Sequence, residues 1–174
     1  RLRYQVASHL SQDYTFHCIT ESPWPGWWSK ILLWEPGRFA GRVLYLDLDI
    51  TVVGSLDEVA DYPAPFAVSR DPLHRNINSS VMVFDVGTQD HIYTKFRPEV
   101  MDLVHGDQDW IQKVSRPDKF PREWFPTYKF DLNYGRIKPS DNVKAILYTG
   151  HPKPWDINNT ASDARSHPNQ PGRA

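Results

Sequence analysis

Two aspartates one residue apart stand between two apolar runs in the stretch VLYLDLDITVVGSL, residues 43–56. Because side chains alternate along a strand, Asp47 and Asp49 project from one face and Leu48 from the other. Their α-carbons would lie about 6.6 Å apart, close enough for both carboxylates to reach one cation or one polar ligand. Without such a partner, the two carboxylates would repel each other at a buried strand end, which raises a pKa or destabilises the fold. The spacing therefore predicts a bound cation or polar ligand.

The residues alone leave two other interpretations of this pair open. In the first, Asp47 and Asp49 lie in a surface turn and cap backbone amides. In the second, LYLDLDIT resembles the D-x-D-x-T motif of the haloacid-dehalogenase-like phosphatases, where Asp47 would be the nucleophile and Asp49 the general acid beside Mg²⁺. The segment GDQD at 106–109 would then supply a further acidic pair. That motif normally lies on the first strand, however, whereas a helix and a strand are predicted before it here.

The elements that must position these residues alternate between helices and strands, which predicts an α/β fold. In such sheets, ligands bind just beyond the carboxyl ends of strands, where the two aspartates stand. The helix that begins near Ser55 has a capping pattern, with Glu58 three residues later. Helices are predicted at residues 2–10, 27–34, 55–62, 88–96, 98–104 and 107–115, and strands at 14–20, within 43–56, and at 65–71, 78–87 and 143–150, with an irregular aromatic stretch at 122–136.

Size and composition limit the classes of protein that fit the chain. Its 174 residues are enough for one domain with a real core, and its net charge of −1 gives no reason to expect binding to nucleic acid. No stretch approaches the length of a transmembrane helix. The single cysteine, Cys18, is predicted to be buried and favours a reducing, cytoplasmic location, with a peripheral association with membranes left open. Residues 1–155 are predicted to form the domain and residues 156–174, which are polar and nonperiodic, a flexible tail.

Four motifs in chain order resemble the glycosyltransferase family 8 type of enzyme: RVLYLDLDITVVGSLDEV, NSSVMVFDVG, GDQDWI and TGHPKPW. The resemblance covers roughly residues 1–155 and implies a GT-A fold, a Rossmann-like mixed sheet flanked by helices. In that fold, the first strand and its loop hold the nucleobase and ribose, and this chain begins after the position of that strand. We therefore expect a catalytic domain that is incomplete at its N-terminus and lacks its first strand.

The resemblance implies the transfer of a sugar, typically a hexose, from a nucleotide-diphosphate donor such as a UDP-sugar to the hydroxyl of a carbohydrate or other acceptor. Asp47 and Asp49 would hold Mn²⁺ or Mg²⁺, which neutralises the departing diphosphate as a Lewis acid, and Asp47 would also touch the nucleotide. Lys153 would place a second positive charge on the diphosphate. Gly150 would let the backbone approach the phosphates closely.

The donor sugar would be held by two further segments that match family motifs. Asn78 and Ser79 stand where the family has NSG. Asp107, Gln108 and Asp109 match its DQD segment at the start of a helix, with Asp107 and Gln108 contacting the sugar and Gln108 nearest the anomeric carbon. The family transfers with retention of configuration, through either a carboxylate nucleophile or a same-face displacement.

One more basic residue and one departure complete the comparison with the family. Lys30, on the Trp-rich helix, matches a basic position that orients the donor and the acidic pair. The family's third metal ligand, a histidine, corresponds to Leu147, which cannot bind a cation. Either His151 compensates, or two carboxylates with water and phosphate hold the metal, or metal binding is weak; we favour the second, because hard cations accept oxygen ligands readily. A non-catalytic relative that binds a nucleotide or glycan is the remaining alternative.

Overall fold

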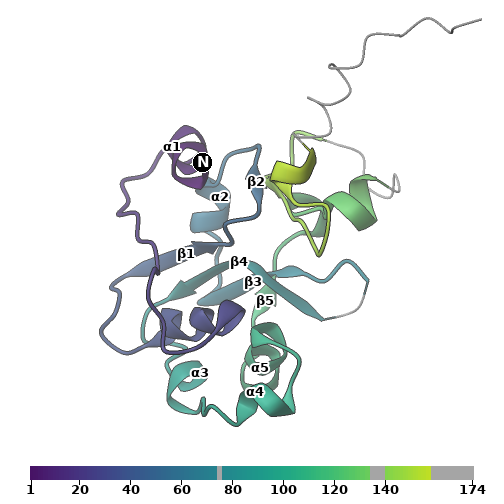
Figure 1. Cartoon of the computed structure of the whole chain (residues 1–174). Coiled ribbons are helices and arrows are strands. Elements are labelled where there is room, and N and C mark those ends of the chain that lie inside the picture. The colour runs from purple at the N-terminus through teal and green to yellow at the C-terminus, as the bar shows by residue number, and fades with distance from the viewer. Residues whose placement is uncertain (74–75, 134–139, 158–174) are drawn as a thin grey trace, which may run out of the picture.

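A mixed sheet lies at the centre of the computed structural model, which describes residues 1–73, 76–133 and 140–157. Among these residues, the sheet has four strands in the order β1-β4-β3-β5. The central strand β4 is antiparallel to both β1 and β3, and the short β5 runs parallel to β3 (Figure 1). The strands are β1 (Arg42–Leu46), β3 (Phe66–Arg70), β4 (Ile77–Asp85) and β5 (Asp118–Lys119). The predicted α/β class with a mixed sheet is confirmed.

Helices and a smaller sheet cover the two faces of the central sheet (Figure 1). On one side lie α1 (Leu2–His9), α2 (Asp57–Ala60) and an antiparallel pair formed by β2 (Thr51–Val52) and β6 (Ala145–Ile146). The 3₁₀ helix η1 lies on the other side with three α-helices. These are η1 (Gly26–Trp34), α3 (His91–Thr94), α4 (Val100–Leu103) and α5 (Asp107–Val114).

Strand β4 contributes to two hydrophobic cores because its side chains alternate between the two faces. Val81 and Val83 are fully buried in the core beneath α1 and α2. Met82 and Phe84 are buried in the core beneath η1 and α5, which is rich in tryptophan and phenylalanine. Strand β4 therefore lies between the two cores, together with β1, which is hydrogen-bonded to it.

Most of the predicted helices are present but shorter than expected. The helix predicted at 27–34 is η1, and those predicted at 88–96, 98–104 and 107–115 are α3, α4 and α5. The irregular aromatic stretch contains η2 (Arg122–Trp124) and a short π-helix, η3 (Tyr128–Leu132). The capping pattern expected at the start of α2 does not form, because the N-cap residue is Leu56, which has no side-chain cap. The Ser55 hydroxyl accepts a hydrogen bond from the Asp57 amide, but Glu58 forms an ion pair with Lys144 instead.

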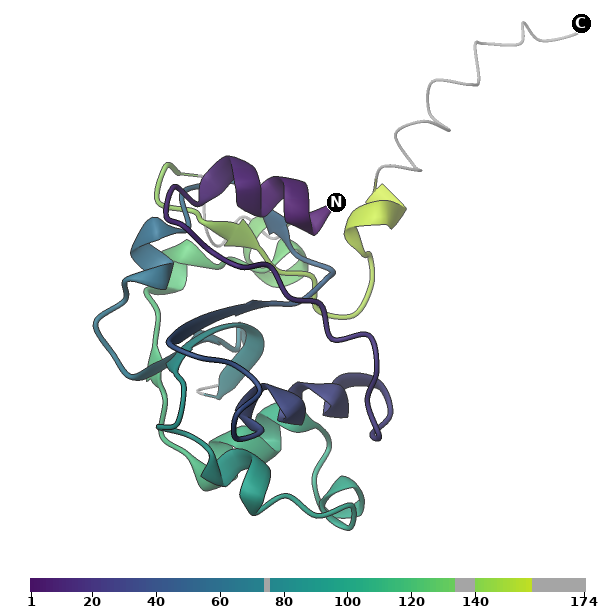
Figure 2. The ribbon, with the colours of Figure 1, turned by 90° about the vertical axis from the view of Figure 1, so that its left-hand side faces the viewer.

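The strand predicted at residues 14–20 is wrong: this segment is extended but forms no ladder with any described residue. It runs from α1 down to η1 (Figure 2), and a cavity of about 800 Å³ separates it from β1. An extended segment needs a hydrogen-bonding neighbour to become a strand, and β1 pairs only with β4 within the described part of the chain. Cys18 is therefore exposed rather than buried as predicted. The expected lack of a first strand stays a prediction.

The helices of the described residues are all too short or too polar to cross a membrane. The predicted tail at 156–174 lies outside the described residues except for Asp156 and Ile157, which belong to a helical turn at 154–157. The proposed boundary between domain and tail therefore stays a prediction.

Candidate active site

Lys30 is buried at the centre of a cluster of charged and polar side chains from four elements. It lies on η1, with only 8% of its surface exposed. Its Nζ atom is 3.1 Å from Asp47 Oδ1, just beyond β1, and 3.4 Å from Asp107 Oδ2, at the start of α5. It also donates a hydrogen bond of 3.1 Å to the Ser79 hydroxyl on β4. Four residues that the sequence places far apart are thus brought together by one ammonium group.

The hydrogen bonds within this cluster fix the orientation of both carboxylates. Ser79 Oγ donates to Asp107 Oδ2 at 2.6 Å, and the Tyr45 hydroxyl donates to Asp47 Oδ1 at the same distance. The backbone amide of Asp47 donates to the Ser80 carbonyl at 2.8 Å. Each carboxylate therefore has at least one neutral donor in addition to Lys30.

The electrostatics of the cluster favour a charged lysine and a neutral tyrosine. Burial disfavours the charged form of Lys30, but Asp47 and Asp107 outweigh that penalty and raise the lysine pKa above its ordinary value. Burial raises the pKa of Tyr45 well above its ordinary range, and the charges of Asp47, Asp107 and Asp49 add to the effect. Both groups hold their protons firmly, so Asp47 keeps its ion pair and its hydrogen bond at neutral pH.

The second aspartate, Asp49, has a lysine partner of its own. Lys153 Nζ forms an ion pair with Asp49 Oδ2 and donates a hydrogen bond of 3.3 Å to the Tyr148 carbonyl. The two side chains in this pair are 23% and 24% exposed. The like charges of Asp47 and Asp49 are therefore balanced by two ammonium groups of the chain itself, a solution that the sequence did not reveal.

The loop that carries Lys153 is shaped by short-range contacts. Gly150 has a φ of +69°, in the left-handed region that favours glycine. Asp156 Oδ2 accepts a hydrogen bond of 2.7 Å from the Lys153 amide and lies 3.2 Å from His151 Nδ1. The bond from the Lys153 amide, followed by the His151 contact, lowers the pKa of Asp156. These contacts fix the loop backbone while leaving the Lys153 ammonium at the surface.

The remaining predicted residues differ in how freely they could contact a ligand. Gln108 and Asp109 are half-buried at the start of α5, and the Gln108 side chain forms no hydrogen bond with any described residue. Asp109 lies 3.6 Å from the exposed His105. Asn78 is buried, and its Oδ1 accepts hydrogen bonds from the Ser80 amide and the Ser69 hydroxyl. The structure therefore gives Asn78 a role in the irregular β3–β4 pairing and brings it no contact with the acidic pair.

Carboxylate oxygens are the ligands that Mn²⁺ and Mg²⁺ prefer, and the Lys153 ammonium on Asp49 shows that this point accepts a cation. Leu147 is fully buried in the core, and His151 turns to Asp156, so neither completes a ligand set. Within the described ranges, no group of three or more His, Cys, Asp or Glu side chains could hold a metal ion. The residues present fit a dication bound by Asp47 and Asp49, with water and a ligand completing its shell.

Two features of the site were missed by the sequence reasoning. Tyr45 lies on β1 two residues before Asp47, and the two aspartates lie in the turn after β1 rather than on the strand as predicted. Trp27 is 57% exposed, and a Cβ added to Gly106 would lie 3.3 Å from its indole nitrogen. The indole therefore packs on the backbone directly before Asp107. No local pattern signals that contact, because it joins η1 to the start of α5.

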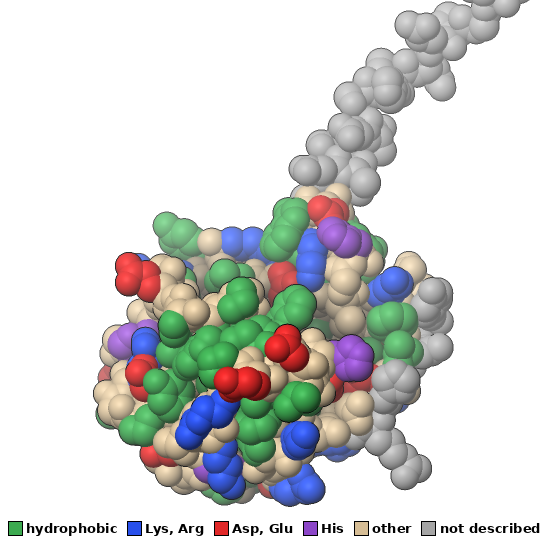
Figure 3. Space-filling model, turned by 60° about the horizontal axis from the view of Figure 1, so that its bottom comes forward, with side chains coloured by type: hydrophobic (Ala, Val, Ile, Leu, Met, Phe, Trp, Pro, Cys, Tyr) green, Lys and Arg blue, Asp and Glu red, His purple; other side chains and the backbone are tan. Residues whose placement is uncertain are grey.

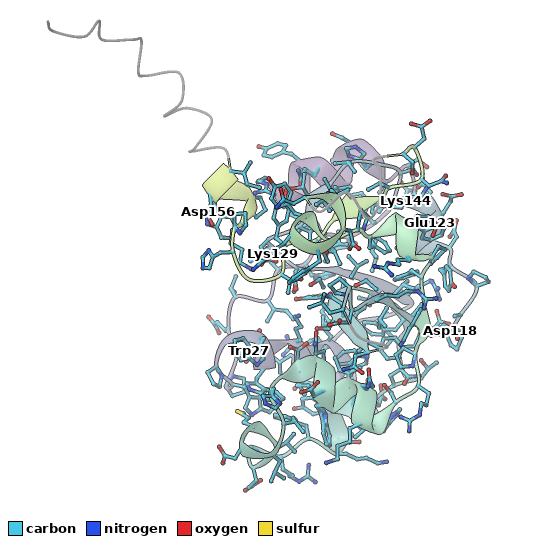
Figure 4. The ribbon with its side chains drawn as sticks, turned by 90° about the vertical axis from the view of Figure 1, so that its right-hand side faces the viewer. Trp27, Asp118, Glu123, Lys129, Lys144 and Asp156 are labelled. Atoms are coloured by element: carbon cyan, nitrogen blue, oxygen red, sulfur yellow. The ribbon has the colours of Figure 1, made fainter. Side chains whose placement is uncertain are left out.

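The surface around the site mixes side chains of every kind. Trp27 and Asp156 lie on the same side of the molecule, below and above the central sheet (Figure 4). On the underside, hydrophobic side chains gather in the middle of the face, with acidic and basic groups among and around them (Figure 3). The large exposed hydrophobic residues include Leu48 and Leu103, which are 71% and 73% exposed.

Comparison with known proteins supports the fold. No family model matches the chain, and no curated protein matches it in sequence. Two crystal structures of the glycosyltransferase GlyE from Streptococcus pneumoniae TIGR4 are similar in fold, with TM-scores of 0.58 and 0.56 at 16% and 17% sequence identity. These alignments cover 73% and 80% of this chain but only 38% and 41% of the GlyE chains. An active-site mutant of LgtC gives a TM-score of 0.46 at 15% identity, with 82% of this chain and 67% of that one covered, and adds no support. The chain thus shares the fold of these GlyE structures, with the mixed sheet expected of it, and spans about two fifths of their length.

Proposed function

We propose that the chain belongs to a glycosyltransferase that moves a sugar from a nucleotide-diphosphate donor, a UDP-sugar, to an acceptor hydroxyl. The observation that carries this proposal is the position of Lys30 between Asp47 and Asp107. This contact joins the acidic pair, where the diphosphate would bind, to the start of α5, where the sugar would bind. The fold similarity to GlyE supports the same conclusion.

On the diphosphate side, the chain would need to collect positive charge around a departing anion. A dication, Mn²⁺ or Mg²⁺, held by Asp47 and Asp49 would supply Lewis acidity there. Lys30 and Tyr45 hold the Asp47 carboxylate in one orientation, so that little ordering is left when the ligand arrives. Lys153 would add a charge from the opposite side, and Gly150 would keep the loop backbone close to the phosphates.

On the sugar side, the side chains at the start of α5 have different freedom. Asp107 is held by both Lys30 and Ser79, whereas the Gln108 amide has no bound partner within the described chain. We assign Gln108 to contact with the donor sugar beside the anomeric carbon, and Asp109 to the edge of the same sugar site. Because Asp107 is held in this way, it is poorly placed as a nucleophile. That supports a same-face displacement over a covalent intermediate on Asp107.

The test is the release of UDP from UDP-sugars in the presence of Mn²⁺, with and without simple sugar acceptors. Asp47→Asn and Asp49→Asn are each expected to lower this activity at least about 100-fold, the size seen when one charged stabilising group is lost. Asp118→Asn is the matched control, since Asp118 lies on β5 away from the cluster and should retain full activity. Hydrolysis of p-nitrophenyl phosphate that Asp47→Asn abolishes would instead support the phosphatase alternative. Binding of UDP and Mn²⁺ without turnover would support a non-catalytic relative.

A further inference from the structure

We infer that Lys153 is an exchangeable counter-ion, which neutralises Asp49 in the free protein and moves to the anionic ligand when a divalent cation takes its place. This inference rests on the proposed function and adds an order of events to it. Its basis is the direct ion pair between Lys153 Nζ and Asp49 Oδ2, which occupies a carboxylate oxygen assigned to the dication.

The contacts of Lys153 are those of a group that can leave. Besides Asp49, its ammonium has one described partner, the Tyr148 carbonyl at 3.3 Å. Lys30, by contrast, contacts two carboxylates and the Ser79 hydroxyl while buried. A partly exposed ammonium is released at lower cost than a buried one.

The loop separates a fixed backbone from a movable head group. The Lys153 amide is held by Asp156, and the neighbouring Pro154 is buried. The four-carbon stem of a lysine can swing its ammonium by several ångströms about such an anchor. The head group can therefore leave Asp49 for a nearby phosphate without a change in the loop itself.

This exchange predicts how two ligands influence one another. A dication that binds alone must displace Lys153 and leave its ammonium without an anionic partner. When a diphosphate is also present, the displaced ammonium pairs with it, so each ligand strengthens the binding of the other. A lysine that only contacts phosphate would not affect the binding of the dication alone.

Calorimetric titration of the full chain with Mn²⁺, in the absence and presence of UDP, tests the exchange. In Lys153→Met, which keeps the stem and loses the charge, Mn²⁺ alone should bind about tenfold more tightly, a coupling within the usual range. UDP should bind more weakly to the Mn²⁺-loaded variant than to the loaded wild type. The mutual strengthening of the two ligands should become weaker, leaving the direct attraction between the dication and the diphosphate. Lys153→Arg, which keeps the charge, should retain most of the wild-type coupling.

Two measurements guard against a trivial result. Lys129→Met is the matched control, because Lys129 lies on the same side of the molecule and, among the described residues, its ammonium contacts the Phe130 ring alone. It should leave Mn²⁺ binding unchanged. Tryptophan fluorescence is compared with and without Trp155→Phe, which separates Trp155 from the other six tryptophans. The signal of Trp155, which is 51% exposed and two residues from Lys153, should change on Mn²⁺ addition in the wild type and far less in Lys153→Met.

The outcomes separate this inference from the proposed function. If Lys153→Met binds Mn²⁺ alone no more tightly than the wild type, while the wild type binds Mn²⁺ and UDP, the exchange is wrong and the transferase assignment stands. If the wild type takes up no Mn²⁺ even with UDP, the metal-assisted function itself fails. Tighter Mn²⁺ binding by Lys153→Met, together with weaker coupling between Mn²⁺ and UDP, supports both the exchange and the metal-assisted function.

Discussion

The two aspartates of the DxD segment are neutralised in two different ways. Asp47 belongs to a buried cluster, where Lys30 is held by two carboxylates and a hydroxyl. Asp49 belongs to a partly exposed pair, where Lys153 has one carboxylate and one carbonyl. The same pairing of lysine with aspartate thus occurs once as part of the core and once as part of a loop. The comparison teaches that the number of supporting contacts, rather than the ion pair itself, separates a fixed charge from an exchangeable one.

Replacing each lysine with methionine gives the largest expected contrast. Lys30→Met should lower the free energy of unfolding by about 3–5 kcal/mol, because Asp47 and Asp107 keep their charges without the ammonium that balances them. Lys153→Met should cost less than about 1 kcal/mol, as is usual for pairs near the surface. Urea unfolding followed by tryptophan fluorescence measures both. Equal losses would show that the two pairs do not differ in the way that their contacts indicate.

Alkaline pH should weaken the buried cluster around Lys30. The raised pKa values of Lys30 and Tyr45 mean that the folded state keeps protons that the unfolded chain loses above about pH 10. This stabilisation is complete below that pH and is lost as the pH rises toward the folded-state values. Tyr45→Phe removes the tyrosine part, so stability should fall less steeply between pH 10 and 11, by up to about 1.4 kcal/mol per pH unit.

Unfolding curves of wild type and Tyr45→Phe at closely spaced pH values provide the measurement. Tyr128→Phe is a suitable control, because Tyr128 shows no contact with the acidic residues of the cluster and instead stacks on Tyr148. An identical pH dependence in wild type and Tyr45→Phe would contradict the assigned environment of Tyr45.

The smallest expected effect concerns Asp156, which accepts a hydrogen bond from the Lys153 amide. Asp156→Ala removes the acceptor of the Lys153 amide, so hydrogen exchange at that amide should become faster while the unfolding midpoint stays the same. The lowered pKa of Asp156 gives a pH test as well: protection should be present above the ordinary carboxyl pKa and lost as the pH falls through the folded value. A lower unfolding midpoint in Asp156→Ala would contradict this, because it would mean that the loop unfolds together with the core.

Local patterns in the sequence predicted those features that depend on neighbours along the chain. The strand at residues 78–87 and the helix at residues 107–115 were predicted from such patterns and are confirmed as β4 and α5. The shared strand face of Asp47 and Asp49 is not, because both residues lie in the turn after β1. Periodicity did not distinguish a 3₁₀ helix from an α-helix at 26–34, because the same apolar residues suit either.

Features that depend on distant partners were beyond such patterns. The segment at 14–20 has strand composition but finds no pairing partner among the described residues, so its composition was misleading. The family resemblance assigned Lys30 to orienting the acidic pair, and Lys30 does lie beside Asp47. It gave no sign that Lys153 would meet Asp49 across 104 positions of sequence. The roles assigned to the site residues stay predictions.

The position of Lys30 also has a consequence for how the chain reaches its native state. Its partners are distant in sequence, since Asp47 lies 17 positions away and Ser79 lies 49. Until β1, β4 and α5 have all assembled around η1, a lysine entering the core would lack the groups that balance it. Closing such loops is the slow part of folding for mixed sheets. The cluster should therefore form late in folding. Compact intermediates with an incorrect strand order would bury Lys30 without its partners and so be destabilised.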